Sequence, residues 1–304
     1  MIDKRRILRL TCILFTGALA ALAQSNWPKL NYVVDPNWPK LPAGWTFEET
    51  VDVAVDARER AFVFHRGPHS LIEFDKAGTV VRSWGDGLYV RPHGLKFDRE
   101  GNLWAIDDQG HVVVKMDSQG RVRMVIGRKN TKGETKDLFN RPTDIAFAAN
   151  GDFYVSDGYG NSRVVKFNKN GEFITAWGKK GSGEGEFNLV HAVALDKEGR
   201  VYVGDRDNHR MQVFDANGKF IAQWKHVGSP WGIVITEDQS LFMCDGYNNR
   251  ILKLNLKGEV LGVLSGPGKL PGQIDYSHHL AIGPTGDIYV AEIKNWRVQK
   301  FVRQ

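Results

Sequence analysis

The stretch Val201-Tyr202-Val203-Gly204-Asp205, followed by Asn208-His209-Arg210-Met211-Gln212-Val213-Phe214, contains the pattern that decides the fold. A run of apolar, strand-forming residues ends in an acid, a short polar turn follows, and an arginine opens a second run. Two such runs on either side of a short turn are typical of paired antiparallel strands. The stretch therefore predicts a β-hairpin.

This hairpin recurs along the chain. Its first strand is predicted six times, at Ala61–His65, Leu103–Asp107, Phe153–Asp157, Val201–Asp205, Leu241–Asp245 and Ile288–Glu292. The second strand follows each time, at Ser70–Phe74, Val112–Met116, Arg163–Phe167, Arg210–Phe214, Arg250–Leu254 and Arg297–Phe301. A further strand precedes each hairpin, as at Gly94–Phe97 and Ala192–Leu195, and a fourth closes the unit, as at Val80–Gly85 and Phe173–Gly178.

Six units of four short strands, each 40 to 50 residues long, predict an all-β fold, a six-bladed β-propeller. No single blade can bury both of its faces, so the six blades must close into a ring. The last unit has no fourth strand after Phe301, and Tyr32-Val33-Val34 is predicted to supply it. We expect residues 24–304 to form this one domain.

Composition and the first residues narrow the function classes. The chain of 304 residues is 42% hydrophobic and 25% charged, which excludes collagen-like, coiled-coil and disordered proteins. Residues 1–23 carry basic residues, then an apolar run that ends in Ala21-Leu22-Ala23, and they predict a secretory signal peptide. We therefore expect an exported protein, periplasmic or secreted, without a membrane partner.

The mature chain offers no cluster of Lys and Arg that would bind nucleic acid, although the whole sequence has a net charge of +6. We expect a monomer that binds a small molecule or peptide carrying a carboxylate. Cys244, in the apolar run Leu241–Cys244, is expected to be a small core residue and not a nucleophile.

The repeats allow equivalent positions to be compared. The residue at the start of each innermost strand, called the channel position here, is in blades 1 to 6 Val51, His93, Thr143, His191, Trp231 and His278. Alternate blades lie about 120° apart around the axis. His93, His191 and His278 should therefore converge and bind zinc, with a fourth position open. Alternatively, they are separate hydrogen-bonded residues of the channel.

The remaining histidines are given other roles. His279 is out of phase with the channel positions and is not expected to join the three. The other five are expected to be surface or turn residues, namely His65, His69, His111, His209 and His226.

The first strand of each hairpin is the second strand of its blade. It ends on the face where the innermost strand begins, because neighbouring strands are antiparallel. Arg66 and Arg206 occupy the same position there in blades 1 and 4, and Tyr159 and Tyr247 lie one position further in blades 3 and 5. Arginine forks suit a carboxylate. Nearby cations can lower the pKa of a tyrosine so that it acts as a base. Alternatively, the arginines form salt bridges at the rim, Arg206 with Asp205 or Asp207, and the tyrosines pack in loops.

The chain resembles the NHL-repeat family at Asn208-His209-Arg210 and at the variants Asn161-Ser162-Arg163, Asn248-Asn249-Arg250 and Asn295-Trp296-Arg297. A narrower resemblance is to the peptidyl-α-hydroxyglycine α-amidating lyases. It rests on Phe64-His65-Arg66-Gly67, Pro92-His93-Gly94-Leu95, Asp157-Gly158-Tyr159, Val190-His191, Asp205-Arg206 and Ser277-His278.

The narrower resemblance implies an exported lyase that splits an α-hydroxyglycine-type substrate into an amide and glyoxylate. It implies zinc on His93, His191 and His278, with Tyr159 as base and Arg66 and Arg206 on the substrate carboxylate. It also implies calcium on the Val53 and Leu95 carbonyls and on an Asp after the third zinc ligand. That last position holds His279, a poor ligand for a hard cation, which makes calcium doubtful.

Two other classes of protein remain open. One is a non-enzymatic NHL propeller that binds a partner on its face. The other is a metal-dependent propeller hydrolase, although such sites use carboxylate and Asn ligands for a hard metal, where this chain has histidine.

Overall fold

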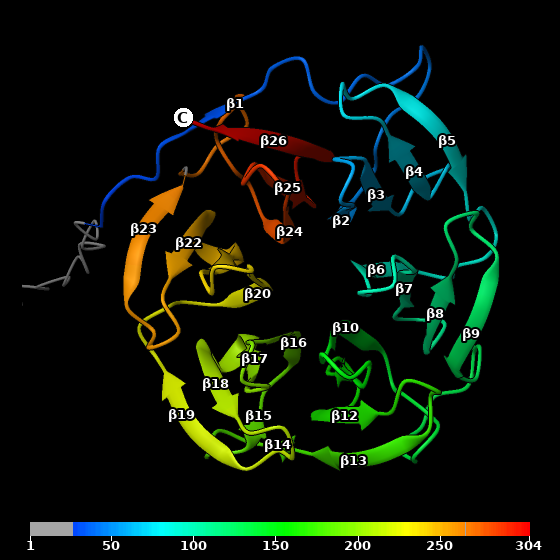
Figure 1. Cartoon of the computed structure of the whole chain (residues 1–304), viewed down its shortest axis with the longest axis vertical. Helices are drawn as coiled ribbons and strands as arrows, with labels where there is room; N and C mark the ends of the chain where they lie inside the picture. Colours follow the sequence, from blue (N-terminus) through cyan, green and yellow to red (C-terminus); the bar gives the residue numbers. More distant parts are fainter. Residues whose placement is uncertain (1–26, 265) are drawn as a thin grey trace, which may run out of the picture.

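The computed structural model describes residues 27–264 and 266–304, so the predicted signal peptide lies outside the described residues. Six four-stranded antiparallel sheets surround one axis, as Figure 1 shows. The predicted six-bladed β-propeller is confirmed. Within these ranges no stretch forms a helix long and apolar enough to cross a membrane.

Each blade runs outward in sequence order. Blade 1 consists of β2 (Thr50–Val55), β3 (Ala61–His65), β4 (Leu71–Phe74) and β5 (Val80–Trp84). Blade 2 consists of β6 (Pro92–Phe97), β7 (Leu103–Asp107), β8 (Val112–Met116) and β9 (Val122–Gly127). Blade 3 consists of β10 (Pro142–Phe147), β11 (Phe153–Asp157), β12 (Arg163–Phe167) and β13 (Phe173–Trp177).

The second half of the ring repeats this order. Blade 4 consists of β16 (Val190–Leu195), β17 (Val201–Asp205), β18 (Arg210–Phe214) and β19 (Phe220–Trp224). Blade 5 consists of β20 (Pro230–Ile235), β21 (Leu241–Asp245), β22 (Arg250–Leu254) and β23 (Val260–Leu264). Blade 6 consists of β24 (Ser277–Ile282), β25 (Ile288–Glu292), β26 (Arg297–Arg303) and β1 (Tyr32–Val34).

The two ends of the chain close the ring in blade 6. Strand β1 pairs antiparallel with β26, and Val34 lies opposite Phe301. Figure 1 shows β1 beside the C-terminus. The predicted closing strand is therefore confirmed, and the first and last parts of the chain share one sheet.

The hydrophobic core lies between the blades. Six clusters of buried residues each join two neighbouring blades, and blade 6 packs against blade 1 in the same way. Val63 and Phe74 of blade 1, for example, share a cluster with Tyr289 and Ala291 of blade 6. Cys244 is fully buried in one of these clusters, as predicted. Removing apolar surface between blades is therefore what holds the ring together.

Three short elements were not predicted. A two-residue parallel pair, β14 (Lys179–Lys180) with β15 (Glu186–Phe187), connects blades 3 and 4. The 3-10 turns η1 (Arg206–Asn208) and η2 (Gly246–Asn248) lie in the hairpins of blades 4 and 5. The two turns occupy the same place in their hairpins and are closed by backbone hydrogen bonds, from His209 to Arg206 and from Asn249 to Gly246.

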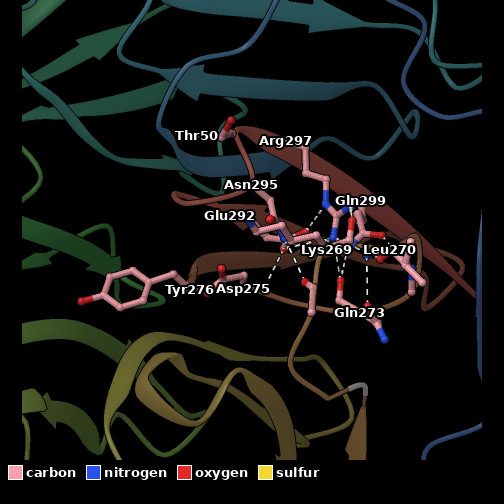
Figure 2. Close-up of polar contacts among 12 residues, drawn as sticks. Thr50, Lys269, Leu270, Gln273, Asp275, Tyr276, Glu292, Asn295, Arg297 and Gln299 are labelled. Atoms are coloured by element: carbon pink, nitrogen blue, oxygen red, sulfur yellow. Dashed lines mark hydrogen bonds and ion pairs between the residues drawn. The ribbon is translucent and has the colours of Figure 1, made fainter.

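In blades 3 to 6 the second strand from the axis ends in a buried acid. This acid accepts hydrogen bonds from the loop that precedes the blade. In blade 6, Glu292 accepts hydrogen bonds from Arg297 Nε (2.8 Å), Asn295 Nδ2 (2.7 Å) and the Asp275 amide (2.9 Å), as Figure 2 shows. Arg297 also donates to the carbonyl of Gln273 (2.7 Å). The Asn-x-Arg pattern therefore exists to satisfy a fully buried carboxylate and the loop carbonyls around it.

The same arrangement recurs in blades 3, 4 and 5, on Asp157, Asp205 and Asp245. In blade 1 an imidazole replaces the carboxylate. His65 is fully buried, and its Nδ1 accepts hydrogen bonds from the amides of Glu48 and Gly67, both 3.3 Å away. The prediction that His65 is a surface or turn residue is wrong, because an acceptor is needed there inside the blade.

Candidate functional site

A β-bulge in every blade positions the candidate site. The pairing of the two innermost strands shifts register at the channel position in all six blades, for example between Pro92 and Gly94 and between Ser277 and His279. A bulged residue is unpaired, and its side chain is re-aimed. The bulge therefore turns His93, His191 and His278 towards the axis.

The three predicted histidines do converge. Their ring centroids lie 4.9 Å (His93–His191), 4.7 Å (His93–His278) and 4.9 Å (His191–His278) apart, and all three side chains are fully buried. They come from the innermost strands β6, β16 and β24, which face one another across the axis in Figure 1.

Each imidazole is oriented by the next blade. Nδ1 of His93 donates to the Thr143 carbonyl (2.7 Å) and Nδ1 of His191 to the Trp231 carbonyl (2.5 Å). Nδ1 of His278 donates in the same way to the carbonyl of Val51 (2.6 Å). A carbonyl accepts only, so Nδ1 carries the proton in all three, and Nε2 presents a lone pair to the channel.

These rings fit a metal ion. Burial lowers the pKa of His93, His191 and His278 well below the usual range, so the rings are neutral, as metal ligands must be. Nε2 of His278 is buried and has no hydrogen-bond partner among the described residues. A metal-bound histidine usually donates a hydrogen bond from its other ring nitrogen to a carbonyl or carboxylate, as these three do. Three neutral imidazole nitrogens suit zinc, copper, iron or nickel.

His279 lies one residue out of phase with the channel position, as expected, but it still contacts the channel histidines. It follows the bulge, so it and His278 turn the same way, and their ring centroids are 4.8 Å apart. The ligand nitrogens of His93, His278 and His279 all lie within 4.8 Å of one another. However, the His279 ring is 6.0 Å from His93 and 5.7 Å from His191, and its Nδ1 lies 3.4 Å from Asp52. His279 therefore lies on a second level, and His191 completes the first.

The second level holds a buried lysine. Nζ of Lys96 lies 3.9 Å from Asp52 Oδ2 and 3.6 Å from Asp144 Oδ1, and both carboxylates are fully buried. Asp52 and Asp144 form with His279 a group whose geometry could hold a metal ion. The Lys96 ammonium already supplies a positive charge there, and this opposes a divalent cation.

The residues proposed for calcium adjoin this level. The amides of Val53 and Leu95 both donate to Asp52, each at 2.7 Å. With His279 where the family pattern has an Asp, and with Lys96 beside Asp52, these surroundings disfavour a hard cation.

Tyr159 reaches two of the three imidazoles, on the face where the repeat comparison predicts it. Its hydroxyl lies 3.2 Å from Nε2 of His93 and 3.3 Å from Nε2 of His191. The preceding residue must be glycine, because a Cβ on Gly158 would lie 1.7 Å from the Val190 carbonyl oxygen. Tyr247 does not share this position, since it is 44% exposed and its hydroxyl lies 3.5 Å from Asp207.

The expected lowering of the Tyr159 pKa is not found in the protein alone. Burial raises the pKa, and this effect outweighs Arg206, Arg91 and Arg66, which lower it. Asp108 adds to the rise. A bound metal ion would add a positive charge beside the hydroxyl and act in the opposite direction.

The two predicted arginines also lie at the site. Arg66 pairs with Glu49 and donates from Nε to the Pro92 carbonyl (3.2 Å), while its buried Nη2 has no partner within residues 27–264 and 266–304. Arg206 pairs with Asp207 (2.8 Å), the salt bridge weighed as an alternative, and its guanidinium lies over the ring of Trp231 at 4.3 Å. Both arginines also lower the pKa of His191 and His278 electrostatically, so both charges act on the channel.

Three charged residues at the channel mouth were missed from the sequence. Arg91 and Arg141 both pair with the buried carboxylate of Asp108, at 2.5 and 3.2 Å. The Arg141 guanidinium also lies 4.6 Å from the Tyr159 ring centroid. Asp108 occupies in blade 2 the position that Arg66 and Arg206 occupy in blades 1 and 4, so the repeat comparison could have found it.

A hollow gives access to Tyr159. It has a volume of about 490 Å³, lies between blades 3 and 4, and is lined by Tyr159, Leu189, Asn188 and Asp207 among others.

The histidines predicted on the surface or in turns, except His65, are at least partly exposed, and His69, His111 and His209 have the left-handed backbone of turn residues.

The fold and the repeat pattern define the class of protein, an NHL-type six-bladed β-propeller. A family model described as a 6-bladed beta-propeller matches residues 132–257. Human NHL repeat-containing protein 3 is 31% identical over 307 residues, which cover 90% of this chain and 85% of that protein. The chain therefore belongs to the family of NHL repeat-containing proteins.

Other relatives have enzyme names. Peptidyl-alpha-hydroxyglycine alpha-amidating lyase 1 of Drosophila melanogaster is 29% identical over 360 residues, covering 95% of this chain and 66% of the relative. Peptidyl-glycine alpha-amidating monooxygenase B of Xenopus laevis is 29% identical over 313 residues, covering 88% of this chain. The chain spans only about a third (35%) of that monooxygenase.

Among solved structures, a streptogramin B lyase superposes with a TM-score of 0.64 at 13% identity, covering 89% of this chain and 97% of that one. At this identity the similarity shows the fold alone.

Proposed function

We propose that the protein is an exported zinc-dependent lyase that cleaves the C–N bond of an N-acyl-α-hydroxyglycine. One observation carries the proposal: the Tyr159 hydroxyl lies within 3.3 Å of Nε2 of both His93 and His191, at the mouth of a ring of three neutral imidazoles. A base next to a metal-ligand set, with cations around both, suits the cleavage of an α-hydroxyglycine, the compound class in the names of the lyase relatives. Export rests on the predicted signal peptide.

Arg66 and Arg206 would bind the substrate carboxylate. The buried Nη2 of Arg66 has no partner in the part of the chain that the structure describes, so a carboxylate there would satisfy a donor that is otherwise costly to bury. Arg206 is held by Asp207 and by the Trp231 ring, which limits its freedom before substrate binds. Each guanidinium presents a planar fork that suits a carboxylate.

His93, His191 and His278 would hold the metal through Nε2. Zinc, when bound, acts as a Lewis acid that makes the substrate hydroxyl easier to ionise. Tyr159, in its phenolate form, accepts the hydroxyl proton and can return it to the leaving amide nitrogen. The electron pair of the O–H bond forms the aldehyde C=O as the C–N bond breaks, and the amide nitrogen leaves with the bonding pair and takes up a proton. The products are an amide and glyoxylate, and no oxidant or reductant is needed.

The direct test uses N-benzoyl-α-hydroxyglycine with the zinc-loaded protein. The proposal predicts benzamide and glyoxylate in equal amounts, released well above the rate of the spontaneous reaction. Glyoxylate is measured by a coupled reductase assay and benzamide by chromatography. Release at the spontaneous rate, with zinc bound, would overturn the proposed reaction and favour a propeller that only binds its partner.

A further inference from the structure

The rim of the channel has two chemically different halves. The residue two before the channel position is charged in blades 1, 2 and 3, where it is Glu49, Arg91 and Arg141. In blades 4, 5 and 6 it is uncharged, where it is Leu189, Ser229 and Tyr276. At this position the rim therefore has a charged half and an uncharged half. The cations on the uncharged half come from other positions: Arg206 lies over the Trp231 ring (4.3 Å) and Lys294 over the Tyr276 ring (4.6 Å).

On the uncharged side three aromatic rings pack against one another. Trp231 contacts Tyr276 at a centroid distance of 4.7 Å and Tyr247 at 5.2 Å, both edge to face. Trp231 is itself 5.0 Å from the His191 ring. We call Trp231, Tyr247 and Tyr276 the aromatic wall. It runs from the channel histidines to the exposed ring of Tyr247.

The wall is fixed before anything binds. Tyr276 has a φ of +63°, a left-handed conformation that is costly for a bulky side chain. Its amide donates to Asn249 Oδ1 (2.8 Å), and its ring points away from the Glu292 cluster in Figure 2. Trp231 packs on Gly246, where a Cβ would lie 2.6 Å from the indole. The equivalent residues Arg141 and Leu189 have the same left-handed backbone, with φ of +64° and +73°, so this conformation belongs to the repeat and fixes where the Tyr276 side chain begins.

Arg206 joins the wall to the site. Its guanidinium lies 4.3 Å from the Trp231 ring and 5.9 Å from the Tyr247 ring. A carboxylate held by Arg206 would therefore leave the acyl group of the same substrate within reach of these rings.

We propose that the aromatic wall binds the acyl group of the substrate and makes the protein selective for N-acyl-α-hydroxyglycines with an aromatic or large apolar acyl group. Burial of apolar surface and edge-to-face ring contacts supply the selectivity. This inference rests on the proposed lyase function.

The test measures kcat/KM for N-benzoyl-, N-acetyl- and N-succinyl-α-hydroxyglycine. The wild-type protein should favour the benzoyl over the acetyl substrate about tenfold, as one aromatic contact plus its buried area provides. Tyr247→Ala should reduce that ratio to about twofold or less. Tyr247→Phe, which keeps the ring, should retain it. Trp296→Ala serves as the matched control, since Trp296 is an exposed aromatic in the turn between β25 and β26.

The possible outcomes separate the two proposals. A benzoyl-to-acetyl ratio near one, or a ratio that Tyr247→Ala leaves unchanged, overturns the aromatic wall and leaves the lyase function standing. Preference for the succinyl substrate would show that the acyl group is selected by charge and not by the aromatic rings, and would also overturn it. No turnover of any of the three substrates overturns the lyase function and this inference with it.

Discussion

Nδ1 of His278 donates to the carbonyl of Val51 over 2.6 Å, across the junction where the last blade meets the first. One of the three candidate metal ligands is therefore oriented by a contact that exists only in the closed ring. The other two are oriented in the same way across the junctions of blades 2 with 3 and 4 with 5. Metal binding and ring closure should stabilise each other.

Zinc is accordingly expected to raise the melting temperature. A ligand that binds only the folded protein, present at 100 times its dissociation constant, adds about 2.7 kcal/mol of stability. That corresponds to a rise of several degrees for a domain of this size. Calorimetry of the chelator-treated protein with and without added zinc measures it. An identical melting temperature in both samples would contradict a metal site at the blade junctions.

His191 and His279 should differ in their effect on metal content. Because His191 lies on the level of His93 and His278, His191→Ala should lose most of the zinc that the wild type holds, about one ion per chain. His279→Ala should retain it, since His279 lies one level deeper beside Asp52. Mass-spectrometric metal analysis of both variants decides. Zinc retained in His191→Ala and lost in His279→Ala would assign the ion to the second level.

Tyr159→Phe should separate the base from the metal. Removing a positioned general base typically costs about 10²- to 10⁴-fold in rate, so kcat for glyoxylate release should fall by that factor. Zinc content should stay at the wild-type level, because the hydroxyl is not one of the three ligands. Tyr247→Phe is the control, as its hydroxyl points to Asp207. Unchanged turnover by Tyr159→Phe would remove this residue as the base.

His65 should make folding stability fall in acid. Burial lowers its pKa from 6.5 to about 4, so the folded protein binds fewer protons than the unfolded chain between these values. The stability that the neutral His65 allows is fully present above about pH 6.5. It is lost as the pH falls to about 4, which lowers the free energy of unfolding by roughly 3 kcal/mol at most.

His65→Asn keeps an acceptor for the amides of Glu48 and Gly67 but cannot titrate. Urea unfolding at pH 7 and pH 4.5 should therefore show a smaller loss of stability in the variant than in the wild type. The exposed His226→Asn provides the comparison. An equal pH dependence in wild type and His65→Asn would show that this imidazole is not the titrating group.

The Asn-x-Arg pattern should be a stability element. Arg210 is 2% exposed, pairs with the buried Asp205 at 2.7 Å and donates to the Glu186 carbonyl at 2.9 Å. Arg210→Ala leaves that carboxylate buried and unpaired, which typically costs about 3–5 kcal/mol. Arg121→Ala, at an exposed pair, should cost under about 1 kcal/mol. Denaturant titration compares them, and equal losses would refute the buried role of Arg210.

Most of the architecture could be predicted because it repeats. In five of the six blades the second strand from the axis ends in an acid. The structure shows why: Glu292 and its equivalents in blades 3 to 5 accept hydrogen bonds from the Asn-x-Arg side chains and from the preceding loop. The closing strand at Tyr32–Val34 followed from the single unit that lacked a fourth strand. The channel histidines were found in the same way, because equivalent positions in alternate blades must face one axis.

Contacts between residues of different repeats could not be predicted from the repeat pattern and were decided by the tertiary structure. The bulge in blade 6 places the His279 ring 4.8 Å from the His278 ring, a contact that the phase of the repeat does not predict. Burial raises the pKa of Tyr159 although four arginines lie near it, because desolvation depends on depth and not on residue type. The Lys96 pairs, the Arg91–Asp108–Arg141 cluster and the aromatic wall join different blades. The sequence by itself determined the strands, their order and the ring; only the closed ring decided which side chains meet at its centre, since those contacts join residues of different repeats.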